Sequence, residues 1–200
     1  MDKNVTTIFL SIALTISFTQ LATVSNPENY LWWLFFYFIF RKVSYYAFDV
    51  RFADLTENIF KEETKMERMF NFFFGISTLF LFIVTGYFII EPHKFFLFNA
   101  LTLFMNIFWI IILRITIDET KDKNPKLTIK KIFKNFIWIN TVEIVFCVTA
   151  GLTILTKVSI KNLQYSDIEP YIYLITLGAL FFMFIIDTIL HKDFLFDPKY

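Results

Sequence analysis

The chain has 200 residues, of which 56% are hydrophobic and 18% are charged, and its mean hydropathy is +0.57. A soluble domain is typically about 45–50% apolar and about 25% charged. The formal net charge of +1 argues against a large basic surface for nucleic acid, and the single cysteine excludes an internal disulfide and a cysteine-based metal cluster. The apolar residues gather into runs of about 20, which is the length that crosses a hydrocarbon core.

These runs predict an all-α integral membrane protein, a polytopic bundle of about six transmembrane helices in a single domain. In chain order the predicted spans cover residues 5–24, 30–50, 70–90, 95–117, 135–156 and 171–190. We expect the first to be a retained membrane helix, because no convincing small-residue cleavage site accompanies it. All five prolines fall in predicted loops, and all four glycines fall inside spans, where small residues mark close helix packing.

The cations outside the spans are segregated. Six spans place the amino terminus, segments 51–69 and 118–134 and the tail on one side, which together with Arg114 at the inner end of the fourth span carries 14 Lys and Arg against three on the other. The positive-inside rule then predicts that both termini are cytoplasmic, in a prokaryotic inner or plasma membrane. Without insertion of the second span, the later spans would invert and violate this rule. The loop charges therefore predict that the second span crosses.

The two polar segments interleave apolar residues with charges at roughly helical spacing. Segment 51–69 fits either a short amphipathic helix at the interface or a cytoplasmic extension of the second span. Segment 118–134 is basic and has two interpretations. Its lysines contact anionic lipid headgroups under the positive-inside rule, or they dock a cytoplasmic protein partner. The lysines concerned are Lys121, Lys123, Lys126, Lys130, Lys131 and Lys134.

An internal repeat relates residues 51–90 to residues 115–154 at a spacing of 64 residues. In this alignment Asp54 matches Asp118. The alternative is a chance match, because Phe, Ile, Val and Thr are common in this chain. If the repeat is a duplication, spans two and three are a parallel copy of spans four and five, an arrangement found in transporters and also in membrane proteins that transport nothing.

Arg41 and Lys42 lie in the middle of the second span. Two cations at a helix centre cost roughly 5–7 kcal/mol, and the eleven residues before them return at most about 0.3–0.6 kcal/mol each. The span is therefore marginal alone. In one interpretation both side chains snorkel to the cytoplasmic headgroups. In the other, one of them faces the bundle interior and pairs with a carboxylate, since adjacent residues point about 100° apart.

Glu143 is the candidate counter-charge, because it lies about 12 Å from the cytoplasmic end of its span and so matches Arg41 in depth. Polar residues share helical faces in three of the spans, and Asp187 has His191 one turn later. These faces predict an intramembrane polar core that is either a functional site or a latch that fixes helix register. The predicted core residues are Arg41, Lys42, Asn106, Asn140, Glu143 and Asp187.

No sequence motif indicates a reaction. The chain lacks HExxH, a phosphate-binding glycine loop, CxxC and a serine-centred motif, so we expect no enzyme, no cofactor and no metal. We expect a small channel, pore or transporter that acts as a homo-oligomer among membrane lipids. The alternative is a non-catalytic membrane sensor, effector or accessory subunit, for example of a prokaryotic defence system or a respiratory complex. Such a subunit would dock a cytoplasmic partner through the basic segments.

Overall fold

The computed structural model describes residues 3–56, 65–119, 124–159 and 169–196, and every element within these ranges is helical. The hydrophobic side chains of the apolar runs are unfavourable in water, and a helix satisfies the backbone hydrogen bonds of such a run internally. The elements are α1 (Lys3–Ala22), α2 (Asn29–Thr56), α3 (Lys65–Tyr87), the short 3-10 helix η1 (Phe88–Ile90), α4 (Pro92–Glu119), α5 (Asn124–Ser159) and α6 (Glu169–Phe196).

Five of the described helices are long and apolar enough to cross a membrane, which makes this an α-helical membrane protein. The qualifying segments are Val5–Ala22, Phe72–Ile90, Pro92–Ile112, Lys130–Thr153 and Pro170–Lys192. The remaining helix, α2, has 28 residues and is about 42 Å long, so its length suffices. Arg41, Lys42 and several tyrosines make it too polar to qualify.

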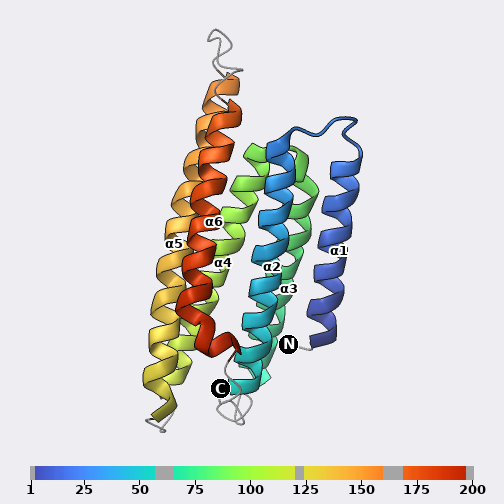
Figure 1. Cartoon of the computed structure of the whole chain (residues 1–200). Helices are drawn as coiled ribbons and strands as arrows, with labels where there is room; N and C mark the ends of the chain where they lie inside the picture. The colour runs from blue at the N-terminus through green and yellow to red at the C-terminus, as the bar shows by residue number, and fades with distance from the viewer. Residues whose placement is uncertain (1–2, 57–64, 120–123, 160–168, 197–200) are drawn as a thin grey trace.

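The helices lie side by side in an elongated bundle, with both chain ends at the same end of it (Figure 1). The helix α4 packs along α5, α1 packs on α3, and α6 packs on α5. The polar helix α2 packs mainly against α6 and α1 and lies between them in Figure 1. This central position brings the cations of α2 next to helices that come much later in the chain.

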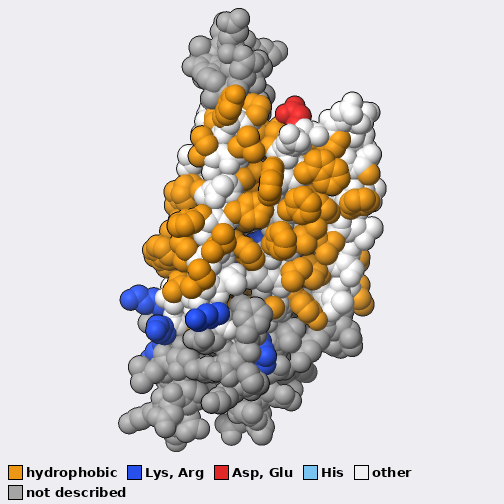
Figure 2. Space-filling view, viewed as in Figure 1, with side chains coloured by type: hydrophobic (Ala, Val, Ile, Leu, Met, Phe, Trp, Pro, Cys, Tyr) orange, Lys and Arg blue, Asp and Glu red, His pale blue; other side chains and the backbone are white. Residues whose placement is uncertain are grey.

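The space-filling view shows hydrophobic side chains spread across the middle of the visible face of the bundle (Figure 2). Over the described helices as a whole, large hydrophobic side chains such as Phe73, Phe80 and Ile175 are 61%, 59% and 73% exposed. Lys and Arg gather at the end where the chain termini lie, and an acidic side chain marks the opposite end (Figure 2). So much exposed apolar surface, bordered by charge, is what a lipid-facing surface requires.

Charged segments extend the helices beyond the apolar runs. The predicted polar segment 51–69 begins as the last turns of α2, which matches the expected extension, and residues 57–64 lie outside the described part of the chain. The predicted Lys-rich segment 118–134 is not a loop over most of its length, because α5 already begins at Asn124. Lysine has high helix propensity, so charge ends an apolar run without ending a helix.

Three of the prolines lie in first turns of helices rather than in loops. Pro92 is the first residue of α4, and Pro125 and Pro170 are second in α5 and α6. A first-turn amide has no helical acceptor, so proline loses no hydrogen bond there. The turn between η1 and α4 is correspondingly tight, with the amide of Glu91 donating to the carbonyl of Phe88 over 2.9 Å.

Two glycines allow close helix packing, as predicted. A Cβ added to Gly86 would lie 2.8 Å from the carbonyl oxygen of Ala13, so α3 approaches the backbone of α1. A Cβ on Gly151 would lie 2.7 Å from Cγ of Leu97, where α5 packs on α4. The prediction is wrong for Gly178, which has no neighbour within 4 Å of an added Cβ. The internal repeat stays a prediction.

Candidate functional site

The Arg41 side chain is fully buried and joins three helices. Its Nε and Nη2 donate to Oε2 of Glu143 on α5, over 3.1 and 2.8 Å. Its Nη1 donates to Oδ2 of Asp187 on α6. A buried guanidinium of this kind needs both hydrogen bonds and counter-charge, because desolvation costs several kcal/mol for each ion. Two carboxylates from different helices provide both for Arg41.

The second oxygen of Asp187 continues the network along α6. Oδ1 lies 2.8 Å from Nδ1 of His191, one turn further along the helix. The other ring nitrogen of His191, Nε2, lies 3.3 Å from the backbone carbonyl oxygen of Ile132 on α5. Asp187 is 4% exposed and His191 is 2% exposed, so this pair is also interior. The network therefore runs from Arg41 toward the end of the bundle that carries the chain termini.

Tyr45 packs beneath the guanidinium on the same face of α2, one turn after Arg41. The Cζ atom of Arg41 lies 4.5 Å from the centre of the Tyr45 ring, a cation–π contact. The Tyr45 hydroxyl donates to Oδ1 of Asn140 over 2.6 Å. Asn140 in turn donates from Nδ2 to the carbonyl of Phe136 over 2.7 Å. These bonds restrict the ring against which Arg41 rests.

Lys42 points to a different side of α2, as the 100° step between adjacent helical residues requires. Its Nζ donates to Oδ1 of Asn99 on α4 over 3.5 Å and lies 4.1 Å from the centre of the Phe82 ring on α3. Asn99 also donates from Nδ2 to the Tyr37 hydroxyl and to Sγ of Cys147, both at 3.5 Å. Lys42 is fully buried, and its partner is the amide of Asn99, whereas the ion pairs with Glu143 and Asp187 are made by Arg41.

Neither cation of α2 snorkels. Both side chains are 0% exposed and are held by interior groups rather than extending to the basic end of the bundle. Of the two interpretations of the sequence, the geometry is that of interior pairing. We define the charge cluster as Arg41, Lys42, Glu143, Asp187 and His191. In this cluster the structure brings α2, which carries both cations, together with the two predicted carboxylates, Glu143 and Asp187.

Two buried polar atoms in the described part of the chain have no hydrogen-bond partner: Oε1 of Glu143 and Nδ2 of Asn106. An unsatisfied buried polar atom costs about 1–3 kcal/mol. Glu143 therefore uses one oxygen for Arg41 and leaves the other available as an acceptor. Asn106 is half buried, and its side chain interacts with Tyr45, so it lies beside the charge cluster.

The predicted lysine surface is described only in part. Lys121 and Lys123 lie outside the described residues, and Lys126 lies in α5 with a side chain that is also outside them. Lys131 and Lys134 are exposed on α5, and Lys130 is half buried.

Sequence reasoning missed Tyr45 and Tyr37 and left His191 and Asn99 outside the predicted site. The available signal was spacing, since Tyr37, Arg41 and Tyr45 follow each other at four-residue intervals on one face of α2. His191 similarly follows Asp187 by four residues.

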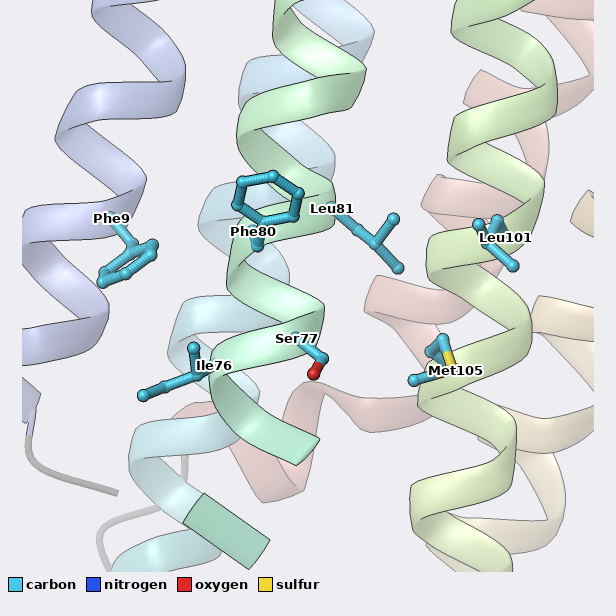
Figure 3. A pocket seen from close by; sticks show the side chains of 7 residues that line it. All are labelled: Phe9, Ile76, Ser77, Phe80, Leu81, Leu101 and Met105. Atoms are coloured by element: carbon cyan, nitrogen blue, oxygen red, sulfur yellow. The ribbon is translucent and has the colours of Figure 1, made fainter. Parts of the chain in front are cut away.

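A groove on the side of the bundle away from the charge cluster's carboxylates has little polar lining. An open groove of about 510 Å³ lies among α1, α3 and α4 and is lined by Phe9, Ile76, Ser77, Phe80, Leu81, Leu101 and Met105 (Figure 3). Its lone hydroxyl, on Ser77, already donates to the carbonyl of Phe73 over 2.8 Å. Within the described residues, no three His, Cys, Asp or Glu side chains come together to hold a metal.

The fold and the charge cluster define a multi-pass α-helical membrane protein with ionic groups enclosed among its helices. No protein-family model, curated protein or solved structure matches the chain.

Proposed function

We propose that the chain crosses the membrane six times, α2 included, and works as a small channel or transporter that moves an ion by way of the charge cluster. The carrying observation is the fully buried Arg41, held between carboxylates from α5 and α6. Ionisable groups are rare in membrane interiors and commonly mark ion pathways. The packing of α2 between α1 and α6 supports its insertion, because its cations are matched by partners inside the bundle.

The charge cluster extends from the middle of the bundle toward the basic end, since Arg41 is the thirteenth of the 28 residues of α2 and His191 lies near the end of α6. On the opposite side of Tyr37, toward the turn between α1 and α2, the interior is apolar and closely packed. The side chains of this apolar layer are all at most 5% exposed: Leu31, Leu34, Phe95, Phe96, Tyr173 and Leu177. A layer of this kind closes an aqueous path, so transport in our proposal requires a conformational change or a path formed between subunits of a homo-oligomer.

Orientation in this proposal follows the charges. Lys131, Lys134 and Lys192 are exposed at the end of the bundle where both chain ends lie. The positive-inside rule assigns that end to the cytoplasm of a prokaryotic cell. The charge cluster then extends from the middle of the membrane toward its cytoplasmic side, and the apolar layer separates it from the outer side.

Ion flux into proteoliposomes tests the proposal. We expect the purified protein to move an ion and Glu143→Gln to reduce the flux by about tenfold or more, because the substitution removes the charge that holds Arg41. Glu28→Gln is the matched control, since Glu28 is exposed outside the helices and should leave the flux unchanged. Equal flux from both variants would show that Glu143 is not part of the ion path.

A second candidate is a membrane accessory or sensor subunit that docks a cytoplasmic protein. The exposed lysines of α5 and α6 at the basic end favour it, because they form a surface separate from the charge cluster. Affinity purification should then recover a partner that the variant Lys131→Glu/Lys134→Glu loses. Under this function the protein conducts no ion, and Glu143→Gln leaves partner recovery unchanged in a folded protein.

A further inference from the structure

We infer that the ion is a proton and that His191 and Asp187 form its binding site at the basic end of the charge cluster. This inference rests on the proposed transport function and specifies its substrate. Its starting point is a contact geometry: both nitrogens of the His191 ring face oxygen atoms that accept hydrogen bonds. They are Oδ1 of Asp187, at 2.8 Å, and the carbonyl oxygen of Ile132, at 3.3 Å.

A neutral imidazole has one N–H donor and one bare nitrogen acceptor, whereas the doubly protonated ring has two donors. Since a backbone carbonyl and an ionised carboxylate only accept, the arrangement around His191 matches the imidazolium. Loss of a proton would turn the lone pair of Nε2 toward the carbonyl of Ile132. The contact between α6 and α5 at this end would then change from attraction to repulsion.

The surroundings of His191 fit a group that exchanges protons with the basic end. Phe48 of α2 and Phe136 of α5 pack against the ring, with centroids at 6.0 and 6.2 Å, and shield it laterally. The charged groups on the interior side are Asp187 of α6, Arg41 of α2 and Glu143 of α5. Toward the basic end, α2 carries Arg51, α5 carries Lys131, and the exposed Lys192 follows His191 in α6.

A proton transfer from His191 to Asp187 changes the ion pairs of the charge cluster. When the Nδ1 proton moves from the imidazolium to Oδ1 of Asp187, the ring becomes neutral and Asp187 becomes a neutral carboxylic acid. The ion pair between Asp187 and Arg41 is then lost, while Arg41 keeps its two hydrogen bonds to Glu143. The unpartnered Oε1 of Glu143 is the acceptor available for the proton further inside. Total charge and proton number are conserved in each transfer.

The protonation state of His191 can be measured independently of transport. The chain has only two histidines, so ¹⁵N-histidine labelling gives signals from the nitrogens of two imidazole rings, and His93→Gln leaves only those of His191. We expect solid-state NMR of the protein in liposomes to show two protonated nitrogens at acidic pH and one after the pH is raised. A ring that keeps a single proton throughout the range in which flux is measured would overturn the inference.

Flux measurements complete the test. We expect a pH-sensitive dye inside proteoliposomes to report proton uptake whose pH profile follows the His191 titration. His191→Gln should lower the uptake by roughly a hundredfold, the scale of losing a general acid–base group. Lys192→Gln is the neighbouring control and should behave as the unmodified protein does. Circular dichroism and gel filtration establish that both variants are folded.

The outcomes separate the inference from the proposed function. Flux of potassium or chloride without proton movement would leave the proposed function standing and refute the proton. Absence of flux for every ion tested would refute both the proposed function and the inference. Undiminished proton uptake by a folded His191→Gln protein would refute His191 as the binding site. If His191→Gln does not fold, agreement or disagreement between the NMR titration and the pH profile of the unmodified protein decides.

Discussion

Arg41 on α2 and Asp187 on α6 are 146 residues apart in the chain and form an ion pair in the interior of the bundle. Glu143, which is 102 residues from Arg41, accepts two further hydrogen bonds from the same guanidinium. One side chain therefore fixes the mutual positions of three helices. Removing it leaves two buried carboxylates without their cation.

Arg41→Leu should lower the free energy of unfolding by about 3–5 kcal/mol, the cost of stranding buried charges. Reversible unfolding in detergent micelles measures it. Lys94→Ala is the matched control, because Lys94 pairs with Glu91 over 2.5 Å at a surface site where both are 40% or more exposed. A surface pair contributes only about 0–1 kcal/mol. Equal losses from the two substitutions would contradict a structural role of the charge cluster.

Replacing the whole ionic triad separates stability from transport. We expect Arg41→Met/Glu143→Leu/Asp187→Leu to recover most of the stability that Arg41→Leu loses, because apolar replacement of a buried ionic triad is often neutral or stabilising by about 1–4 kcal/mol. We expect this triple variant to show no ion flux. If this triple variant transports normally, the triad is a latch that sets helix register and the proposed ion path is wrong.

Gly86→Ala should destabilise the protein by about 1–3 kcal/mol, the usual cost of overpacking. The added Cβ would meet the backbone of α1 at 2.8 Å, and a backbone oxygen cannot rotate away. Gly178→Ala is the control and should be neutral or stabilising by up to about 1 kcal/mol, because its site is open and alanine favours helix. Thermal unfolding of both variants under the same condition measures the two effects. A Gly178→Ala protein that is less stable than the Gly86→Ala protein would contradict the prediction.

Cysteine labelling tests whether α2 crosses the membrane. Asn26 is exposed before α2, and Met69 is 57% exposed in the first turns of α3. In a Cys147→Ala background, Asn26→Cys should react with an impermeant maleimide from outside the cell and Met69→Cys only after permeabilisation. The same reactivity at both positions would mean that α2 does not cross.

Residue spacing predicts much of the fold and part of the charge cluster. Apolar runs locate the helices, and counting turns from a span end places Glu143 at the depth of Arg41. Helix ends are predicted less well, since α5 begins at Asn124, well before its apolar run. The roughly helical spacing of apolar residues in segment 118–134 agrees with this early start, but the apolar run alone does not mark where the helix begins.

The remaining contacts depend on rotation of each helix about its axis and on the order of packing. Only the assembled bundle turns Lys42 toward Asn99 and Phe82 instead of toward a carboxylate. The bond from His191 to Ile132 uses a backbone carbonyl, which every residue has, so no residue type marks it in the sequence. Tyr45, in contrast, could be predicted from the sequence, because it follows Arg41 by four residues and so shares its helical face.

The long chain separation within the charge cluster also has a consequence for biosynthesis. Ribosomes add about 5–20 residues per second, so roughly 5–30 seconds pass between the synthesis of Arg41 and that of Glu143 and Asp187. During that interval α2 has both its cations and neither carboxylate of the finished bundle. In the proposed six-span topology, the nascent α2 therefore waits beside the translocon, at the interface or against an insertase, and it becomes a stable part of the membrane only when α5 and α6 arrive.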